Sequence, residues 1–187
     1  GKMLWYLVVA TIPAAIAGVL FEEVIENTIR KNYVVIALAL AVMGVIIYFA
    51  DKYSKSSNNL KKMTIKDALI IGCSQVLALI PGFSRSGTTI ATGRILGINR
   101  EDAAKFSFYL SAPVVCGALV LQLLKKATWT VIAANLGTFI LGVLISFVVG
   151  LLCIKYLLKY LHNHNFKVFM IYRIILAIIV LIMIGVK

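Results

Sequence analysis

Long uncharged stretches alternate with short charged ones along the whole chain. Stretches of at least 18 residues with no more than one charged side chain cover residues 3–21, 33–50, 106–124, 127–154 and 168–186. A helix needs about 20 residues to cross the hydrocarbon core of a bilayer. The pattern predicts five membrane-spanning helices, the fourth of which begins at residue 136. Residues 127–135 are expected to hold the turn before it, and residues 22–31 to form a short charged loop.

A further, mostly apolar region, residues 67–98, is interrupted near its middle by Pro81 and Gly82. At a rise of about 1.5 Å per residue, its halves, residues 67–80 and 88–98, are about 15–21 Å long as helices. Each half is too short for a hydrocarbon core of about 30 Å. The pattern predicts a re-entrant hairpin over residues 67–98 that returns to the side from which it enters. The alternative is one kinked helix that crosses fully through Pro81.

Composition supports the membrane interpretation. Of the 187 residues, 61% are hydrophobic, and the mean hydropathy is +0.99. Soluble domains are usually about 45–50% apolar. We therefore expect an all-α polytopic membrane protein with a single membrane domain over residues 1–187. The net charge of +12 is typical of basic cytoplasmic loops rather than of a nucleic-acid-binding protein.

Basic residues collect in cytoplasmic loops, so their distribution predicts the orientation. If residues 67–98 form a hairpin, the side that holds both of its ends carries twelve basic residues: Lys2, Lys52, Lys55, Lys61, Lys62, Lys66, Arg94, Arg100, Lys105, Lys155, Lys159 and Lys167. The other side carries five: Arg30, Lys31, Lys125, Lys126 and Lys187. A full crossing would reduce this bias to nine against eight. The count favours the hairpin and places its ends in the cytoplasm.

The centre of the hairpin carries an isolated charge. Arg85 is the only charged residue between residues 68 and 93, and a guanidinium at membrane depth costs roughly 2.5–3.5 kcal/mol on insertion scales. The first amides of a helix lack partners and attract anions, glycines allow close backbone approach, and an arginine fork binds phosphate oxygens. The pattern predicts a phosphate or diphosphate site that also includes Gly82, Ser84, Ser86, Gly87, Thr88 and Thr89. The alternative is that Arg85 bonds carbonyl groups freed by Pro81 while the hydroxyls cap the helix.

Other candidate chemistry is weaker. The three cysteines, Cys73, Cys116 and Cys153, lie far apart in apolar segments and lack metal-ligand spacing. Glu22 and Glu26 would share a helix face, but their neighbours are those of a charged loop. We expect these two carboxylates to be solvated rather than catalytic.

The motif at residues 82–89, preceded by residues 72–75 and 77–81, resembles the second conserved motif of the undecaprenyl-diphosphate phosphatases. The similarity continues through residues 106–108, through Ala112-Pro113, and through Ile171-Tyr172-Arg173. This resemblance implies hydrolysis of undecaprenyl diphosphate to the monophosphate and phosphate. It further implies a multi-pass protein of the bacterial inner membrane, a role in recycling the cell-wall lipid carrier, and bacitracin resistance. A transporter or binding protein for an anionic lipid is the alternative function.

The resemblance also assigns roles. Arg85 and Ser84 are expected to be catalytic, Arg85 as the clamp on the diphosphate and Ser84 as a candidate nucleophile without a base in this chain. The residues expected to bind substrate are Gly82, Ser86, Gly87, Thr88, Thr89 and Gln75. For Gln75, a role as a polar residue in helix packing is the alternative. The family implies a divalent cation, Mg²⁺ or Ca²⁺, for which this sequence shows no ligand set. The expected partners are a polyprenyl diphosphate lipid, the membrane and a second copy in a homodimer.

Members of the family are longer at the N-terminus, where they carry a first re-entrant motif with a Glu-x-x-x-Glu pair. We expect this chain to hold the second half of an inverted repeat, in which two hairpins meet to form one site. On this expectation the chain alone has little activity.

Overall fold

The computed structural model describes residues 1–185, except the side chains of residues 22, 26, 126 and 127. Within this part, the regular structure consists of helices and one isolated backbone bridge between Asn58 and Ile98. The α-helices are α1 (Lys2–Leu20), α2 (Glu22–Val24), α3 (Tyr33–Tyr53), α4 (Ile65–Ser74), α5 (Arg85–Ile95), α6 (Arg100–Leu123), α7 (Lys126–Ala134), α8 (Leu136–Asn163) and α9 (Lys167–Gly185). A π-helical turn η1 (Ile25–Ile29) follows α2, and a 3-10 helix η2 (Gln75–Leu79) follows α4.

Five of these helices are long and apolar enough to cross a membrane: α1, α3, α6, α8 and α9. This confirms the predicted all-α polytopic membrane protein. Most of the spanning helices extend beyond the predicted uncharged stretches into neighbouring charged residues. A helix can continue into the membrane interface, because charged side chains reach water there. Residue 186, the predicted end of the last span, lies outside the described part.

Two connections that we predicted as non-helical are helical. Residues 126–134 form α7 instead of a turn, and residues 22–29 form α2 and η1 instead of an irregular loop. In α7, the indole nitrogen of Trp129 donates to the carbonyl oxygen of Leu123 over 2.8 Å, which ties the helix back to the end of α6. The side chains of Glu22 and Glu26, which we expected to be solvated, lie outside the described part.

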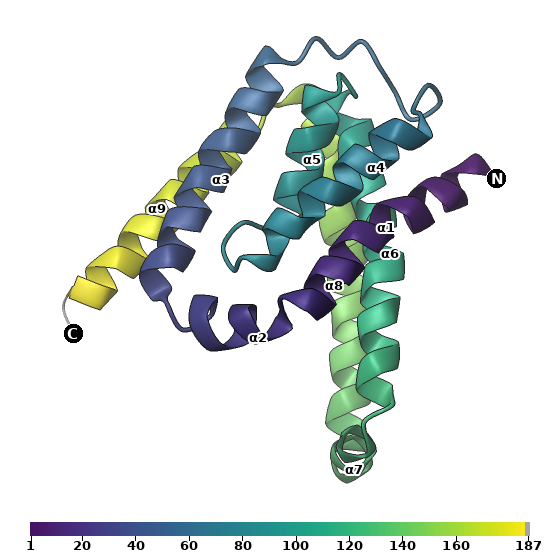
Figure 1. Cartoon of the computed structure of the whole chain (residues 1–187), viewed down its shortest axis with the longest axis vertical. Coiled ribbons are helices and arrows are strands. Elements are labelled where there is room, and N and C mark those ends of the chain that lie inside the picture. The colour runs from purple at the N-terminus through teal and green to yellow at the C-terminus, as the bar shows by residue number, and fades with distance from the viewer. Residues whose placement is uncertain (186–187) are drawn as a thin grey trace.

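The helices pack around α5. Helix α3 lies along α9, α1 lies along α4, and α5 contacts α3, α4 and α6 (Figure 1). Figure 1 shows α3 and α9 on one side of α5, with α6 and the long α8 on the other. Few residues of α8 are buried, so most of its apolar surface is exposed in this arrangement. Such a surface suits contact with lipid.

The chain reverses direction between α4 and α5, as Figure 1 shows. The start of α4 and the end of α5 lie at the same end of the molecule. There, the amide of Asn58 donates to the carbonyl oxygen of Gly97 over 2.9 Å, and the amide of Asn99 donates back to the carbonyl oxygen of Asn58 over 3.1 Å. This geometry is that of a hairpin. It contradicts one kinked helix through Pro81.

A buried ion pair fastens the end of the hairpin to α3. Arg94 is 1% exposed, and its Nε lies 2.8 Å from Oδ1 of Asp51, which is 2% exposed. Nε of Arg100, at the start of α6, lies 2.7 Å from the same oxygen. One carboxylate therefore joins the ends of α3 and α5 to the start of α6. The sequence pattern gave no indication of this contact, since we had counted Arg94 among the basic residues of the cytoplasmic side.

Candidate active site

The loop between the two hairpin helices is held in an unusual backbone conformation. Ser84 precedes α5 with φ of 70°, and its Oγ accepts a hydrogen bond from the amide of Gly87 over 3.2 Å. Positive φ is uncommon for a residue other than glycine, and such conformations cluster at functional sites. Gly82 has φ of 99°, and an added Cβ would lie 2.5 Å from the carbonyl oxygen of Ile36 in α3. The loop therefore packs directly on α3, and only glycine fits at residue 82.

Arg173 satisfies backbone groups of this loop. From α9, its Nη2 donates to the carbonyl oxygens of Gly82 and Phe83, and its Nε donates to the carbonyl oxygen of Leu40 over 3.1 Å. A carbonyl that lacks a helical partner after Pro81 would be costly to bury without a donor. We had weighed this role for Arg85, but the structure assigns it to Arg173.

Arg85 points elsewhere. Its Nη2 donates to Oγ of Ser111 in α6 over 2.6 Å. Its Nη1 is buried without a hydrogen-bond partner among the described residues. A buried, charged donor without an acceptor costs more than a neutral one. Arg85 therefore keeps a hydrogen-bond donor that no described residue uses.

Thr88, Thr89 and Gln75, which we predicted to bind substrate, are each 2–3% exposed. The hydroxyls of Thr88 and Thr89 lie 2.9 Å and 3.0 Å from the carbonyl oxygen of Arg85, which stabilises the first turn of α5. Nε2 of Gln75 donates to the carbonyl oxygen of Ala10 in α1 over 2.9 Å, while its Oε1 is buried and has no partner in residues 1–185 as described. The structure thus places these three side chains in helix packing. Their role in binding remains a prediction.

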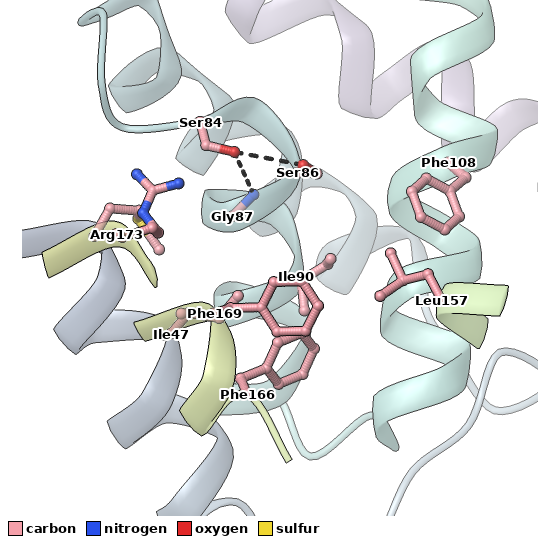
Figure 2. A pocket seen from close by; sticks show the side chains of 11 residues that line it. Ile47, Ser84, Ser86, Gly87, Ile90, Phe108, Leu157, Phe166, Phe169 and Arg173 are labelled. Atoms are coloured by element: carbon pink, nitrogen blue, oxygen red, sulfur yellow. Dashed lines mark hydrogen bonds between the residues drawn. The ribbon is translucent and has the colours of Figure 1, made fainter. Parts of the chain in front are cut away.

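A cavity of about 100 Å³ opens beside the loop (Figure 2). Its polar lining comprises Ser84, Ser86, Gly87 and Arg173. Figure 2 shows Arg173 on one side of it and Phe108 and Leu157 on the other. The apolar lining residues are Met43, Ile47, Ile90, Phe108, Leu157, Phe166 and Phe169. Of the predicted site residues, this cavity brings together Ser84, Ser86 and Gly87, whereas Arg85 is directed towards α6.

The residues around the loop do not fit a divalent cation. Mg²⁺ and Ca²⁺ prefer carboxylate and carbonyl oxygens, whereas residues 80–89 include no carboxylate and the carbonyl oxygens of Gly82 and Phe83 already accept from Arg173. Among the described residues, no three His, Cys, Asp or Glu side chains gather into a possible ligand set. We therefore assign no chemical step to a metal in this chain.

Sequence reasoning missed Ser111 as a partner of Arg85 and left Arg173 without a role. Ser111 had no distinguishing signal, because one serine in an apolar span is common. Arg173 carried a usable one, because a single arginine in an otherwise uncharged stretch of 19 residues needs a compensating partner.

Comparison with known proteins identifies the family of this chain. The family model described as bacitracin resistance protein BacA matches residues 1–179. The chain is 47% identical to an undecaprenyl-diphosphatase of Elusimicrobium minutum and 45% identical to one of Caldicellulosiruptor bescii. It is 43% identical to one of Desulforudis audaxviator. Each match covers 97% of this chain and 68% of the relative. The chain belongs to the bacitracin resistance protein BacA family.

Proposed function

We propose that this protein hydrolyses undecaprenyl diphosphate to undecaprenyl phosphate and inorganic phosphate, and so recycles a lipid carrier of cell-wall synthesis. The observation that carries the proposal is Arg85, which stands at the first position of α5 with a buried Nη1 that meets no acceptor among the residues that the structure describes. Relatives over 40% identical are named for this activity.

The chemistry of Arg85 suits a diphosphate. A guanidinium stays charged under all physiological conditions and presents a planar set of donors to phosphate oxygens. The start of a helix adds about half a positive charge and amides without intrahelical partners. Because Arg173 already serves the carbonyl groups of the loop, Arg85 is available for the ligand. Since Nη1 is covered, neighbouring side chains must move apart as the ligand enters.

In the reaction, the oxygen of a water molecule forms a bond to the terminal phosphorus, and the bond from that phosphorus to the bridging oxygen breaks. The products are inorganic phosphate, the lipid monophosphate and a proton, which the attacking water releases to solvent. Arg85 stabilises the negative charge on the transferred group, which is the main contribution that proteins make to phosphoryl transfer. Ser84 and Ser86 orient the diphosphate through their hydroxyl groups, whose oxygens lie 3.4 Å apart. Among the described residues, Oγ of Ser84 contacts the hydroxyl of Ser86 and the amide of Gly87, and neither group is a general base, so we assign the attack to water.

The reaction takes place within the cell membrane, where we propose that α4 and α5 form a re-entrant hairpin. The reversal of the chain and the distribution of basic residues support entry from the cytoplasmic side. Irregular backbone at membrane depth is tolerated where protein surrounds it, as α3, α6 and α9 do here. The apolar side chains that line the cavity beside Ser84 and Ser86 suit an isoprene unit next to the diphosphate.

The test is phosphate release from undecaprenyl diphosphate by the purified protein in lipid nanodiscs, together with equilibrium binding of the same lipid. We expect binding of the lipid and a slow release of phosphate, in keeping with the little activity expected of this chain, and both should be reduced at least tenfold by Arg85→Ala. Binding without release at any protein concentration would instead favour a lipid-binding or transport function. Unchanged binding in Arg85→Ala would contradict the assigned site. A matched control is Lys125→Ala, which removes an exposed cation far along the chain from the loop.

A further inference from the structure

Helix α6 presents two hydroxyl groups to α5 from an otherwise apolar region. Ser107 and Ser111 lie one turn apart, and the hydroxyl of Ser111 donates to the carbonyl oxygen of Ser107 over 3.2 Å. Oγ of Ser107 lies 2.8 Å from Oγ1 of Thr89, and Oγ of Ser111 accepts from Nη2 of Arg85 over 2.6 Å. Both contacts join α5 to α6, and the second one is made by the guanidinium of Arg85.

The direction of these hydrogen bonds determines that Ser111 acts as an acceptor towards Arg85. A serine hydroxyl has one hydrogen, and that of Ser111 is used by the carbonyl group of Ser107. Its lone pairs therefore face Arg85, which supplies the only charge in the contact. Hydrogen bonds to a charged partner are short and about twice as strong as neutral ones. One edge of the guanidinium is thus held, while Nη1 has no partner within the described part of the chain.

We propose that Ser111 is a positioning residue, which holds Nη2 of Arg85 so that Nη1 is presented to a phosphate oxygen of the ligand. The inference rests on the proposed function, because it assumes that the ligand carries a diphosphate. An arginine side chain has several rotatable bonds, and ordering it only on binding would cost affinity. Ser111 provides that order before the ligand arrives.

A purely structural role predicts something different. Thr89 and Ser107 already connect α5 to α6, and apolar residues such as Ala103 and Phe106 pack in the same interface. Ser111 is only half-buried, so replacing it by alanine removes little packing. The loss should therefore appear in ligand binding and not in folding.

The test measures binding of farnesyl diphosphate, a short polyprenyl diphosphate, to the purified 187-residue chain by calorimetry. We expect Ser111→Ala to weaken binding about tenfold, the effect of one hydrogen bond to a charged group. Ser111→Thr, which keeps the hydroxyl, should restore most of the affinity. Ser146→Ala on the exposed face of α8 is the matched control and should bind as the unaltered protein does. Melting temperatures of all variants report whether the fold is intact.

A double-mutant cycle separates the two hypotheses. In an Arg85→Ala background, Ser111→Ala should cause no further loss, because Ser111 acts through the guanidinium. If Arg85→Ala binds normally, the proposed function and this inference both fail. If Arg85→Ala is weak but Ser111→Ala binds normally or more tightly, only the inference fails. An equal loss from Ser111→Ala in both backgrounds would show that Ser111 acts through the fold, and would overturn the inference.

Discussion

Arg173 of α9 donates a hydrogen bond to the carbonyl oxygen of Gly82, 91 residues earlier in the chain. Together with its bond to Leu40, this contact makes one guanidinium a support for both α3 and the loop before α5. Arg173→Gln should lower the melting temperature and impair ligand binding, since the loop carbonyls lose their charged donor. Thermal unfolding followed in detergent, with binding of farnesyl diphosphate, measures both effects.

Arg173→Lys provides the matched comparison, because it keeps the charge but loses the planar set of donors. We expect a melting temperature between those of the unaltered protein and Arg173→Gln, because the lysine can still donate a hydrogen bond to one of the two loop carbonyl groups. If Arg173→Gln melts as the unaltered protein does, the support assigned to this side chain is absent.

The buried Asp51–Arg94 pair makes a prediction about stability. Removing one partner of a buried ion pair usually costs about 3–5 kcal/mol, because the other charge is left uncompensated. We expect Asp51→Asn to destabilise the protein by this order, measured by equilibrium unfolding in mixed micelles. The substitution should lower the free energy of unfolding more than it lowers the free energy of ligand binding. Asp51 pairs with Arg94 and Arg100, which lie away from the loop before α5.

Glu101→Gln is the matched control for this substitution. Glu101 pairs with Lys105 at 2.6 Å, and both side chains are one-third exposed. A pair of this kind is worth about 0–1 kcal/mol. Equal losses of unfolding free energy from Asp51→Asn and Glu101→Gln would show that the Asp51–Arg94 pair stabilises the protein no more than an exposed pair does.

The close approach of α1 to α4 depends on Gly72. An added Cβ at Gly72 would lie 2.4 Å from the carbonyl oxygen of Ala10. This distance is shorter than the non-bonded contacts that Cβ atoms make in proteins. Gly72→Ala should therefore force α1 and α4 apart, disturb the contact between Gln75 and Ala10, and lower the melting temperature by several degrees.

The same substitution at Gly117 in α6 meets nothing within 4 Å. That variant should be neutral or slightly stabilised, because alanine favours helix by about 1 kcal/mol over glycine. A smaller loss at Gly72 than at Gly117 would contradict the packing described.

The re-entrant hairpin makes a prediction about sidedness. Single cysteines at Lys61, before the hairpin, and Lys125, after α6, should be labelled from opposite sides of the membrane in a background without Cys73, Cys116 and Cys153. A full crossing between residues 67 and 98 would instead place both positions on the same side. Labelling of oriented vesicles with an impermeant maleimide distinguishes the two, and a cysteine at Asn165 should behave as the one at Lys61 does.

Much of the fold follows from local features of the sequence. Runs of uncharged residues predict the five spans, because span length is set by the thickness of a bilayer. Pro81 and Gly82 predict the break in the hairpin, since proline cannot continue a helix from within. Helix α7 was missed because residues 127–135 carry no charge, and length alone led us to treat them as a turn.

The site was less accessible to prediction, because its contacts join distant residues. The types of residue at 82–89 indicated an anion-binding loop, but nothing in their order says that Arg173 serves the carbonyl groups and Arg85 turns to α6. Ser111 lies 26 residues from Arg85, and the contact exists only because α5 and α6 pack together. The burial of Thr88 and Thr89 likewise depends on which face of α5 meets its neighbours.

The most direct test of the account is an experimental structure of the protein with a non-hydrolysable polyprenyl diphosphate. We expect a phosphate oxygen within hydrogen-bonding distance of Nη1 of Arg85, with Nη2 still bound to Ser111 and Arg173 still on the loop carbonyls. A diphosphate bound elsewhere, with Nη1 of Arg85 facing only protein, would contradict the central claim.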